Sequence, residues 1–461
     1  MTRSASLARY YGATKPYAGP TKQLPCDDGS RPEKIQGKAP LDDFESGRAK
    51  KGYFCNARQV SNYGATGGYR VERYVDDAGH ECAFWDSTLL WPHNAPDQGE
   101  DGPGVYVMDM KDPSKPVVTE VLRTAAMQSP HESLRLNTKR GLLVSVFAYP
   151  TWQPGFVDIY SVKQDCRHPV LESSTPMGIL GHEGGFSPDG KTYYSAGLYG
   201  HTLAAIDVSD PKAPVLLWAT EDYQPHGVSV SNDGTRLYIA EAAFSDDGGD
   251  FSGLTILDTS EIQERVLNPN VKLVSRLTWP QVSTPQNATP FTLNGHKFLF
   301  ETDEFGSGDN VGAARIIDIE NEKKPFVVSN LRLAVNNEGE QTEDPGDDAP
   351  FQGYQAHYCT LPSRVDPYIV ACTFIMSGLR VFDIRDPAAP REIAYFNKPL
   401  MPGEKPYYPT KSGAFAMSAP AYDQSSGDIW YTDGHTGFYV VRLTDGARVE
   451  RFARRIVTPG N

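Results

Sequence analysis

The chain has 461 residues, and its 58 aspartate and glutamate residues outnumber its 44 lysine and arginine residues, giving a formal net charge of −14 at pH 7. Such a charge repels phosphate backbones and anionic lipid surfaces, so we expect neither a nucleic acid nor a membrane as partner. The sequence also lacks a run of about 18 apolar residues, the length that a membrane-spanning helix requires.

The first 52 residues contain proline, glycine, lysine and aspartate without hydrophobic periodicity. Such a composition is typical of irregular chain rather than of helices or strands. We therefore expect an irregular N-terminal arm over residues 1–52 and a folded unit over residues 53–461.

The folded unit contains a repeated pattern that is clearest in residues 376–396. An apolar strand at 379–384 ends in Asp-Pro, a short turn follows, and a second strand begins near Arg391. Weaker copies begin at Gly104, His201, Gly253 and Ala314. A supersecondary unit that repeats in this way buries its apolar face by stacking on its neighbours.

Seven groups of strands are predicted from the turns between the first two strands of each group. These turns lie at 76–79, 137–141, 187–190, 231–234, 293–295, 362–367 and 423–427. Each group comprises four strands in about 45 to 60 residues, which is typical of β-propeller blades. The fold class is therefore all-β, a seven-bladed propeller whose last blade is completed by a strand near either 56–63 or 449–456.

The repeated strand with its following Asp-Pro turn resembles the LVIVD-repeat family of β-propellers over roughly residues 70–443. Members of that family are largely exported. A related propeller, that of a cyanobacterial alkylating enzyme, implies that such a scaffold can host carbon–carbon bond formation. More distantly, the chain is similar to selenium-binding proteins, propellers associated with metal-dependent methanethiol oxidation.

Six cysteines are present without a CxxC pair, so a zinc knuckle is not expected and disulfides are an alternative to free buried thiols. Cys359 and Cys372 lie on predicted neighbouring strands, while Cys26, Cys55 and Cys82 belong to the N-terminal region. Disulfides indicate a secreted or periplasmic protein, although no apolar signal segment precedes Tyr10.

Four of the ten histidines occupy one position in the repeat, roughly eight residues before the first turn and at the start of the innermost strand. They are His182 (HEGGFSPDG), His226 (HGVSVSNDG), His357 (HYCTLPSRVDP) and, with two extra residues, His131 (HESLRLNTKRG). Because the innermost strands line the central channel of a propeller, we expect the four side chains to converge at one mouth of that channel.

Converging imidazoles are suited to binding a transition metal ion, and Cu, Fe, Mn and Zn all fit. Carotenoid-cleaving oxygenases, which hold iron by four histidines on a seven-bladed propeller, are an architectural analogy without a shared motif. The alternative is a structural histidine in each blade that bonds a backbone carbonyl of its neighbour.

The loops after the second strand of each blade open on the same face and carry a second set of polar side chains. This set includes Asp86, Glu241, Glu301 with Asp303 and Glu304, and Asp433 with His435. We expect Glu241, Glu301 and His435 to orient the histidines or to act as general bases, the alternative being solvated or turn-capping groups.

Three hypotheses for function follow. The first is a metal-dependent enzyme acting on a small organic molecule, with an oxidoreductase favoured over a lyase because a histidine-only shell suits a redox metal. The second is a metal-free lyase or alkylating enzyme that uses His, Tyr and carboxylate acid–base chemistry. The third is a binding propeller without turnover. A GxSxG elbow, a P-loop and a GxGxxG fingerprint are absent from the sequence.

Overall fold

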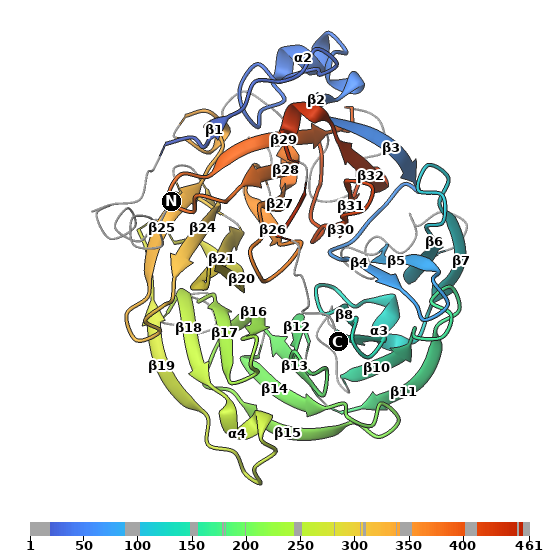
Figure 1. Cartoon of the computed structure of the whole chain (residues 1–461), viewed down its shortest axis with the longest axis vertical. Coiled ribbons are helices and arrows are strands. Elements are labelled where there is room, and N and C mark those ends of the chain that lie inside the picture. The colour runs from blue at the N-terminus through green and yellow to red at the C-terminus, as the bar shows by residue number, and fades with distance from the viewer. Residues whose placement is uncertain are drawn as a thin grey trace.

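The computed structural model describes residues 19–87, 102–147, 155–177, 179, 181–198, 200–243, 251–280, 282–304, 306–307, 310–337, 339–341, 353–401, 413–449 and 451–454. Within these ranges, seven antiparallel sheets with four blade strands each surround a central channel (Figure 1). The predicted seven-bladed β-propeller is confirmed.

The first four blades follow the chain in order. Blade 1 contains β4 (Val71–Val75), β5 (Glu81–Asp86), β6 (Val105–Asp109) and β7 (Val117–Leu122). Blade 2 contains β8 (Arg135–Asn137), β9 (Leu142–Val146), β10 (Phe156–Ser161) and β11 (Val170–Pro176). Blade 3 contains β12 (Glu183–Phe186), β13 (Thr192–Gly197), β14 (Thr202–Asp207) and β15 (Val215–Thr220). Blade 4 contains β16 (Pro225–Val230), β17 (Arg236–Glu241), β18 (Gly253–Asp258) and β19 (Lys272–Leu277).

The remaining blades complete the ring. Blade 5 contains β20 (Thr284–Leu293), β21 (His296–Glu304), β24 (Ala314–Asp318) and β25 (Phe326–Leu331), with the hairpin of β22 (Gly306–Ser307) and β23 (Asn310–Val311) between β21 and β24 in the chain. Blade 6 contains β26 (Ala356–Thr360), β27 (Ile369–Phe374), β28 (Gly378–Asp383) and β29 (Arg391–Asn397). Blade 7 contains β30 (Ala421–Asp423), β31 (Asp428–Asp433), β32 (Gly437–Leu443) and, from the start of the chain, β3 (Ala57–Tyr63). Short helices connect some strands: α3 (Ala125–Gln128), α4 (Ser260–Gln263), η4 (Ala334–Asn336), η5 (Ile375–Ser377) and η6 (Asp445–Ala447).

Strand β3 closes the ring, because it pairs antiparallel with β32 and so joins the two ends of the propeller. Of the two predicted closing segments, the N-terminal one is therefore correct. In the C-terminal segment, of which residue 449 and residues 451–454 are described, Ala453 instead forms an antiparallel bridge with Pro367, which lies between β26 and β27 of blade 6. Closure leaves no open edge between the first and last blades.

The hydrophobic core lies between neighbouring blades rather than in one central mass. One apolar cluster joins blades 3 and 4, for example, through Tyr194, Leu203, Val228 and Ile239. Strands near the channel are buried on both faces, whereas the outer strands β11, β15 and β19 alternate between exposed and partly buried positions. The blade interfaces therefore provide the rigid frame that surrounds the channel.

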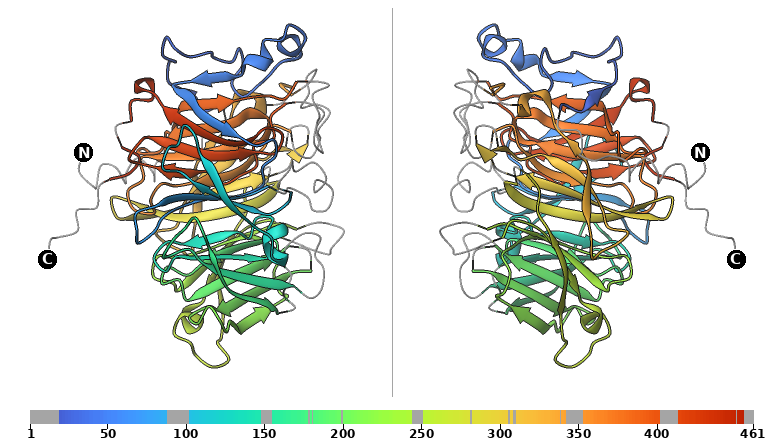
Figure 2. Two further views of the ribbon diagram at one scale, coloured as in Figure 1. Left: turned by 90° about the vertical axis from the view of Figure 1, so that its right-hand side faces the viewer. Right: turned by 90° about the vertical axis from the view of Figure 1, so that its left-hand side faces the viewer.

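The described part of the N-terminal arm covers the outer edge of blade 6, drawn in blue beside β29 in Figure 1 and at the rim of the disc in Figure 2. It contains β1 (Lys22–Gln23), α2 (Leu41–Glu45) and η1 (Ala49–Lys51), and β2 (Tyr53–Cys55) follows it directly. Both β1 and β2 pair with β29, and the Arg380 side chain of β28 forms a buried ion pair with Glu33 of the arm. The arm therefore shields an edge strand that would otherwise be open to another chain.

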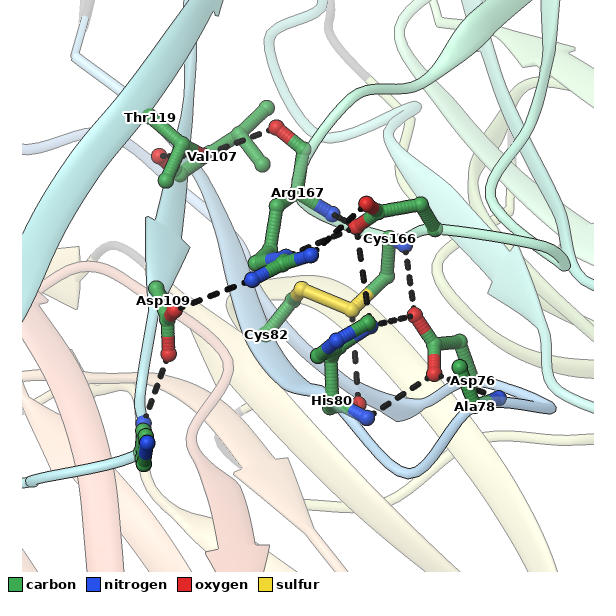
Figure 3. Close-up of a disulfide and its surroundings, with 11 residues drawn as sticks. Asp76, Ala78, His80, Cys82, Val107, Asp109, Thr119, Cys166 and Arg167 are labelled. Carbon is green, nitrogen blue, oxygen red and sulfur yellow. Dashed lines mark hydrogen bonds and ion pairs between the residues drawn. A yellow bond between two sulfur atoms is a disulfide. The ribbon is translucent and has the colours of Figure 1, made fainter.

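All six cysteines form disulfides: Cys26–Cys55, Cys82–Cys166 and Cys359–Cys372. The first disulfide links the arm to β2. The third joins β26 to β27, the neighbouring strands on which Cys359 and Cys372 were predicted to lie. The second links blade 1 to blade 2, and beside it Asp76 accepts hydrogen bonds from the backbone of Cys166 and from His80 (Figure 3). Within the described residues, no helix is long and apolar enough to cross a membrane.

Candidate metal centre in the channel

The structure brings the four predicted histidines together at one end of the channel. His182 directly precedes β12, His131 lies four residues before the first residue of β8, and His226 and His357 are the second residues of β16 and β26. The ring centroids of His131 and His182 lie 4.3 Å apart, and those of His182 and His226 lie 4.9 Å apart. None of the four residues is more than 6% exposed.

Bulges in the innermost strands aim two of these histidines into the channel. The pairing of β16 with β17 skips His226, and the pairing of β26 with β27 skips His357. Blade 5 has the same irregularity at Gln286. A bulge places an extra residue on one strand and turns its side chain away from the regular alternation. The same local device thus directs one polar side chain from each of three blades towards a common point.

Hydrogen bonds to neighbouring blades fix two of the imidazole rings. Nδ1 of His226 lies 2.9 Å from the carbonyl oxygen of Pro285, and Nδ1 of His357 lies 2.5 Å from that of Met417. Each Nδ1–H donates to this carbonyl, so Nε2 is the nitrogen that faces the channel. This is the arrangement by which proteins orient a metal-binding histidine. The structural alternative, a histidine in each blade bonded to a carbonyl of its neighbour, is thus seen for His226 and His357, and such a bond is compatible with metal binding.

Two buried carboxylates share the site with the histidines. Glu132 Oε2 lies 3.3 Å from Nε2 of His182, and Glu132 Oε1 lies 3.1 Å from Nε2 of His357. Glu304, the last residue of β21, places Oε1 3.3 Å from Nε2 of His357 and Oε2 3.6 Å from Nε2 of His226. The site is therefore a mixed group of imidazoles and carboxylates, whereas the sequence predicts the four histidines alone as metal ligands.

Glu132 reaches the site because of the backbone conformation of the residue before it. His131 has a φ of +50°, in the left-handed region that non-glycine residues seldom occupy. In a regular strand, adjacent side chains point to opposite faces. The left-handed conformation removes this alternation, and ligand atoms of His131, Glu132 and His182 all lie within 4.8 Å of one another.

A second layer of side chains holds the Glu132 carboxylate in place. Glu132 Oε2 accepts hydrogen bonds from Gln286 Nε2 at 2.5 Å and from the Tyr358 hydroxyl at 3.0 Å. The Arg70 guanidinium carbon lies 4.0 Å from the centroid of the Tyr358 ring. These contacts come from blades 1, 5 and 6, so the position of the carboxylate depends on the whole ring being closed.

Burial and the charges of neighbouring side chains shift the pKa values of the histidines and of Glu132. Burial, followed by the nearby His182, lowers the pKa of His226 to about 4. Burial by itself also lowers the pKa of His357, but Glu304 and Glu132 outweigh it and raise that pKa to about 9. The pKa of Glu132 is held well below its usual value by His182 and His357, although burial opposes this. The Glu132 carboxylate is thus ionised beside a neutral His226 and a protonated His357 at neutral pH.

Tyr69, two residues before β4 of blade 1, packs next to the imidazoles. Its ring centroid lies 4.2 Å from that of His131 and 5.4 Å from that of His357. Tyr69 also belongs to a buried apolar cluster with Ile375, Phe415 and Met417. The imidazoles are therefore bordered on one side by apolar surface and on the other by the hydrogen-bonded layer beneath Glu132.

The three other predicted residues lie outside this group. Glu241, the last residue of β17, accepts a hydrogen bond from Thr255 and lies 3.5 Å from Arg276. The Nδ1 atom of His435 lies 3.2 Å from the carbonyl oxygen of Gly413, and its ring stacks on Phe415.

The partners of Glu301 lie within blade 5. Arg315 forms a buried ion pair with Glu301 and a second one, at 3.0 Å, with Asp303. The described partners of Glu241 and Glu301 thus belong to their own blades, and those of His435 belong to the loop that contains Gly413 and Phe415. The carboxylates next to the histidines are Glu132 and Glu304 instead.

Sequence reasoning missed Glu132 and Gln286. A signal for Gln286 exists, since it stands in blade 5 at the position that His226 and His357 hold in their blades. No such signal exists for Glu132, because the backbone conformation that brings it to the site is not encoded in a recognisable motif.

No protein-family model matches the chain, and no curated protein sequence matches it, so the LVIVD-repeat family has no support beyond the resemblance itself. Solved structures match at the level of the fold. Hydrazine synthase from Kuenenia stuttgartiensis has a TM-score of 0.51 and 13% identity, covering 83% of this chain and 97% of that one. The Cps50 (Swd1) β-propeller domain from Myceliophteria thermophila has a TM-score of 0.51 and 10% identity, covering 84% and 98%.

A periplasmic gluconolactonase from Pseudomonas aeruginosa, PpgL, has a TM-score of 0.47 and 15% identity, covering 75% of this chain and 93% of that one. At these identities the two matches with a TM-score of 0.51 establish the propeller fold alone. A propeller fold hosts many functions, so the function of this protein depends on the side chains in the channel.

Proposed function

We propose that the protein is a metal-dependent enzyme, an oxidoreductase acting on a small organic molecule at the mouth of the channel. In this proposal His131, His182, His226 and His357 bind a transition metal ion (Cu, Fe, Mn or Zn), with Glu132 and Glu304 beside them. The observation that supports it is the convergence of four buried imidazoles, two of them oriented through Nδ1, on two buried carboxylates.

The charge of the site favours a cation. Glu132 and Glu304 are buried and share the site with four imidazoles, which carry no charge when neutral. Buried carboxylates without a compensating charge are costly. In the metal-free protein a proton on His357 compensates only one of the two charges, whereas a divalent cation compensates both.

The ligand types favour redox chemistry. Imidazole is a common ligand of copper and iron, and an imidazole-rich shell leaves room for a substrate or for oxygen as a further ligand. The bound ion would supply the Lewis acidity or the electron transfer, while Glu132 and Glu304 accept protons at their carboxylate oxygens. The apolar cluster of Tyr69, Ile375, Phe415 and Met417 next to the imidazoles favours an organic substrate over a small ion.

Elemental analysis of protein purified without a polyhistidine tag tests this proposal, with a His182→Ala/His226→Ala double variant as comparison. We expect about one tightly held transition-metal equivalent in the wild type and its loss in the variant, with circular dichroism confirming that the fold persists. No bound metal after reconstitution with Cu, Fe, Mn and Zn would contradict the proposal.

A second candidate is a metal-free lyase or alkylating enzyme, and the raised pKa of His357 favours it. With a pKa of about 9, set by Glu304 and Glu132 against burial, this imidazole is protonated at neutral pH and could donate a proton to a substrate. Activity that survives exhaustive chelation would select this candidate. Absence of both metal and turnover would leave a binding propeller.

We further propose that the protein works in the periplasm or outside the cell. All six cysteines are oxidised, which is typical of secreted and periplasmic proteins. We also propose that the chain belongs to the LVIVD-repeat family. Members of that family are largely exported, which agrees with this location. The expected partner is a small-molecule substrate rather than a nucleic acid or a membrane.

A further inference from the structure

A cavity of about 520 Å³ lies at the end of the channel opposite the histidines. The histidines stand where the innermost strands begin, whereas the cavity is lined by the ends of those strands and by the turns that follow, such as residues 136–138 and 186–188. Its lining includes the polar side chains of Arg70, Glu72, Arg73, Arg135, Asn287 and Arg364. The volume falls within the usual range for small-molecule sites, about 300–1,000 Å³.

The cavity is rich in guanidinium groups, in a protein whose net charge is −14. Four arginines line it, and Glu72 is the acidic side chain among its described lining residues. Arg73 is neutralised within the wall, because it pairs with Glu81 at 2.5 Å and with Asp423 at 3.2 Å.

In the part of the chain that the structure describes, the other three arginines of the cavity do not each have a carboxylate of their own as an ion-pair partner. Arg70 and Arg135 share the single carboxylate of Glu183. That carboxylate is already saturated, since it also accepts hydrogen bonds from the backbone of Val228 at 2.6 Å and from Asn287 at 3.2 Å.

Arg364 reaches across the channel from the loop between β26 and β27. Its described hydrogen bond goes to the backbone carbonyl of Val230 in blade 4, at 2.7 Å, and not to a carboxylate. Apart from Arg73, the cavity thus has three guanidinium groups and, among the described residues, only two carboxylates near them, those of Glu183 and Glu72. Burial raises the pKa of Glu72, although Arg135 and Arg70 oppose this, which further weakens its compensation.

We propose that this cavity binds a small organic anion, with a carboxylate or phosphate group held by Arg135 and Arg364. Guanidinium groups bind both kinds of oxyanion through paired N–H donors. The desolvation of Arg135 agrees with this role: burial, and then the charge of Arg70, lower its pKa to about 9, and a bound anion would reverse that shift.

This site is separate from the proposed metal centre. Arg70 lies between them, donating from Nε to the carbonyl oxygen of Glu132 at 3.0 Å while its guanidinium packs on Tyr358. Ligand binding in the cavity therefore does not require a metal ion, and the two proposals can fail independently.

Isothermal titration calorimetry of chelator-treated protein at low chloride concentration tests the inference, with inorganic phosphate and succinate as probes. We expect one equivalent of at least one probe to bind the wild type, and the His182→Ala/His226→Ala variant to bind it equally well. Arg364→Met and Arg135→Met should each weaken binding at least tenfold. The Arg140→Met variant is the matched control, because the Arg140 side chain also bonds backbone carbonyls but lies outside the cavity.

Saturable binding by neither probe would overturn the inference, as would wild-type affinity in Arg364→Met. The Arg364→Met variant keeps the test decisive even if Arg135→Met fails to fold. Arg364 takes no part in the ion pairs of Glu183, so we expect its replacement to leave the fold intact. Which of the two probes binds tells whether the cavity selects a phosphate or a carboxylate.

Discussion

Glu132 Oε1 lies 3.1 Å from Nε2 of His357, although the two residues belong to blades 2 and 6. This contact crosses the channel and exists only because the ring is closed. The contact places the Glu132 carboxylate among the imidazoles that the sequence repeat predicts to converge. The chemistry of the channel mouth therefore depends on a residue whose partners lie in other blades.

Replacing Glu132 tests its part in the proposed metal centre. We expect Glu132→Gln to weaken transition-metal binding about 10- to 100-fold, the usual effect of removing a group that orients or supports metal ligands. Competition with a chromophoric chelator measures the affinity. Glu241→Gln is the matched control, a buried strand-end carboxylate whose described partners are Thr255, Gln224 and Arg276. Equal affinities in the wild type and Glu132→Gln would contradict this role.

Removing the charge of Glu183 should destabilise the fold. Its carboxylate is fully buried and pairs with both Arg70 and Arg135, so Glu183→Gln leaves two guanidinium groups without their counter-ion. We expect a loss of about 3–5 kcal/mol in the free energy of unfolding, measured in urea. Asp42→Asn, which breaks an exposed ion pair with Lys34, should cost far less, because solvent screens the attraction between exposed charges. Similar costs for the two variants would refute the prediction.

Asp86 gives a pH dependence of defined sign. Burial raises its pKa to about 7, although hydrogen bonds from the backbone of Arg70 and Tyr69 oppose this. The folded protein therefore binds a proton that the unfolded chain, with a pKa near 3.8, has released. By linkage, this group stabilises the fold below about pH 4, and that contribution falls by ~4 kcal/mol as the pH rises to about 7.

The Asp86→Asn variant isolates this contribution, because an amide does not titrate in this range. The difference in unfolding free energy between the wild type and the variant should shrink, or change sign in favour of the variant, between pH 4 and pH 7. A difference that is constant with pH would show that Asp86 does not titrate in this window.

The disulfides should contribute unequally to stability. Cys82–Cys166 spans 84 residues, whereas Cys359–Cys372 spans 13. In the chain-entropy description, a cross-link that closes a longer loop restricts the unfolded chain more. We expect Cys82→Ala/Cys166→Ala to lose roughly 1–2 kcal/mol more than Cys359→Ala/Cys372→Ala in urea unfolding. The opposite order would indicate that local packing within blade 6 dominates.

Several features of the fold were predictable because each is set by local sequence. The turns at 187–190 and 231–234 mark equivalent places in consecutive repeats, and counting such turns predicts seven blades, which the structure confirms. The neighbouring positions of Cys359 and Cys372 also follow from the strand order of one blade.

The choice of closing strand was not predictable in this way. Two segments had suitable composition, and β3 closes the ring because its residues pair with residues 438–443 of β32. Such pairing between the two ends of a chain depends on the shape of the whole ring, which no local pattern records.

By itself the sequence determined the repeat, the seven blades and the convergence of His131, His182, His226 and His357, because equivalent positions in a closed array point to the same axis. Only the tertiary structure decided which carboxylates join them. Glu132 enters through the left-handed backbone at His131, and Glu304 enters from the second strand of blade 5. Contacts across a channel depend on exact backbone directions in several blades at once, and residue spacing along the chain does not specify these directions.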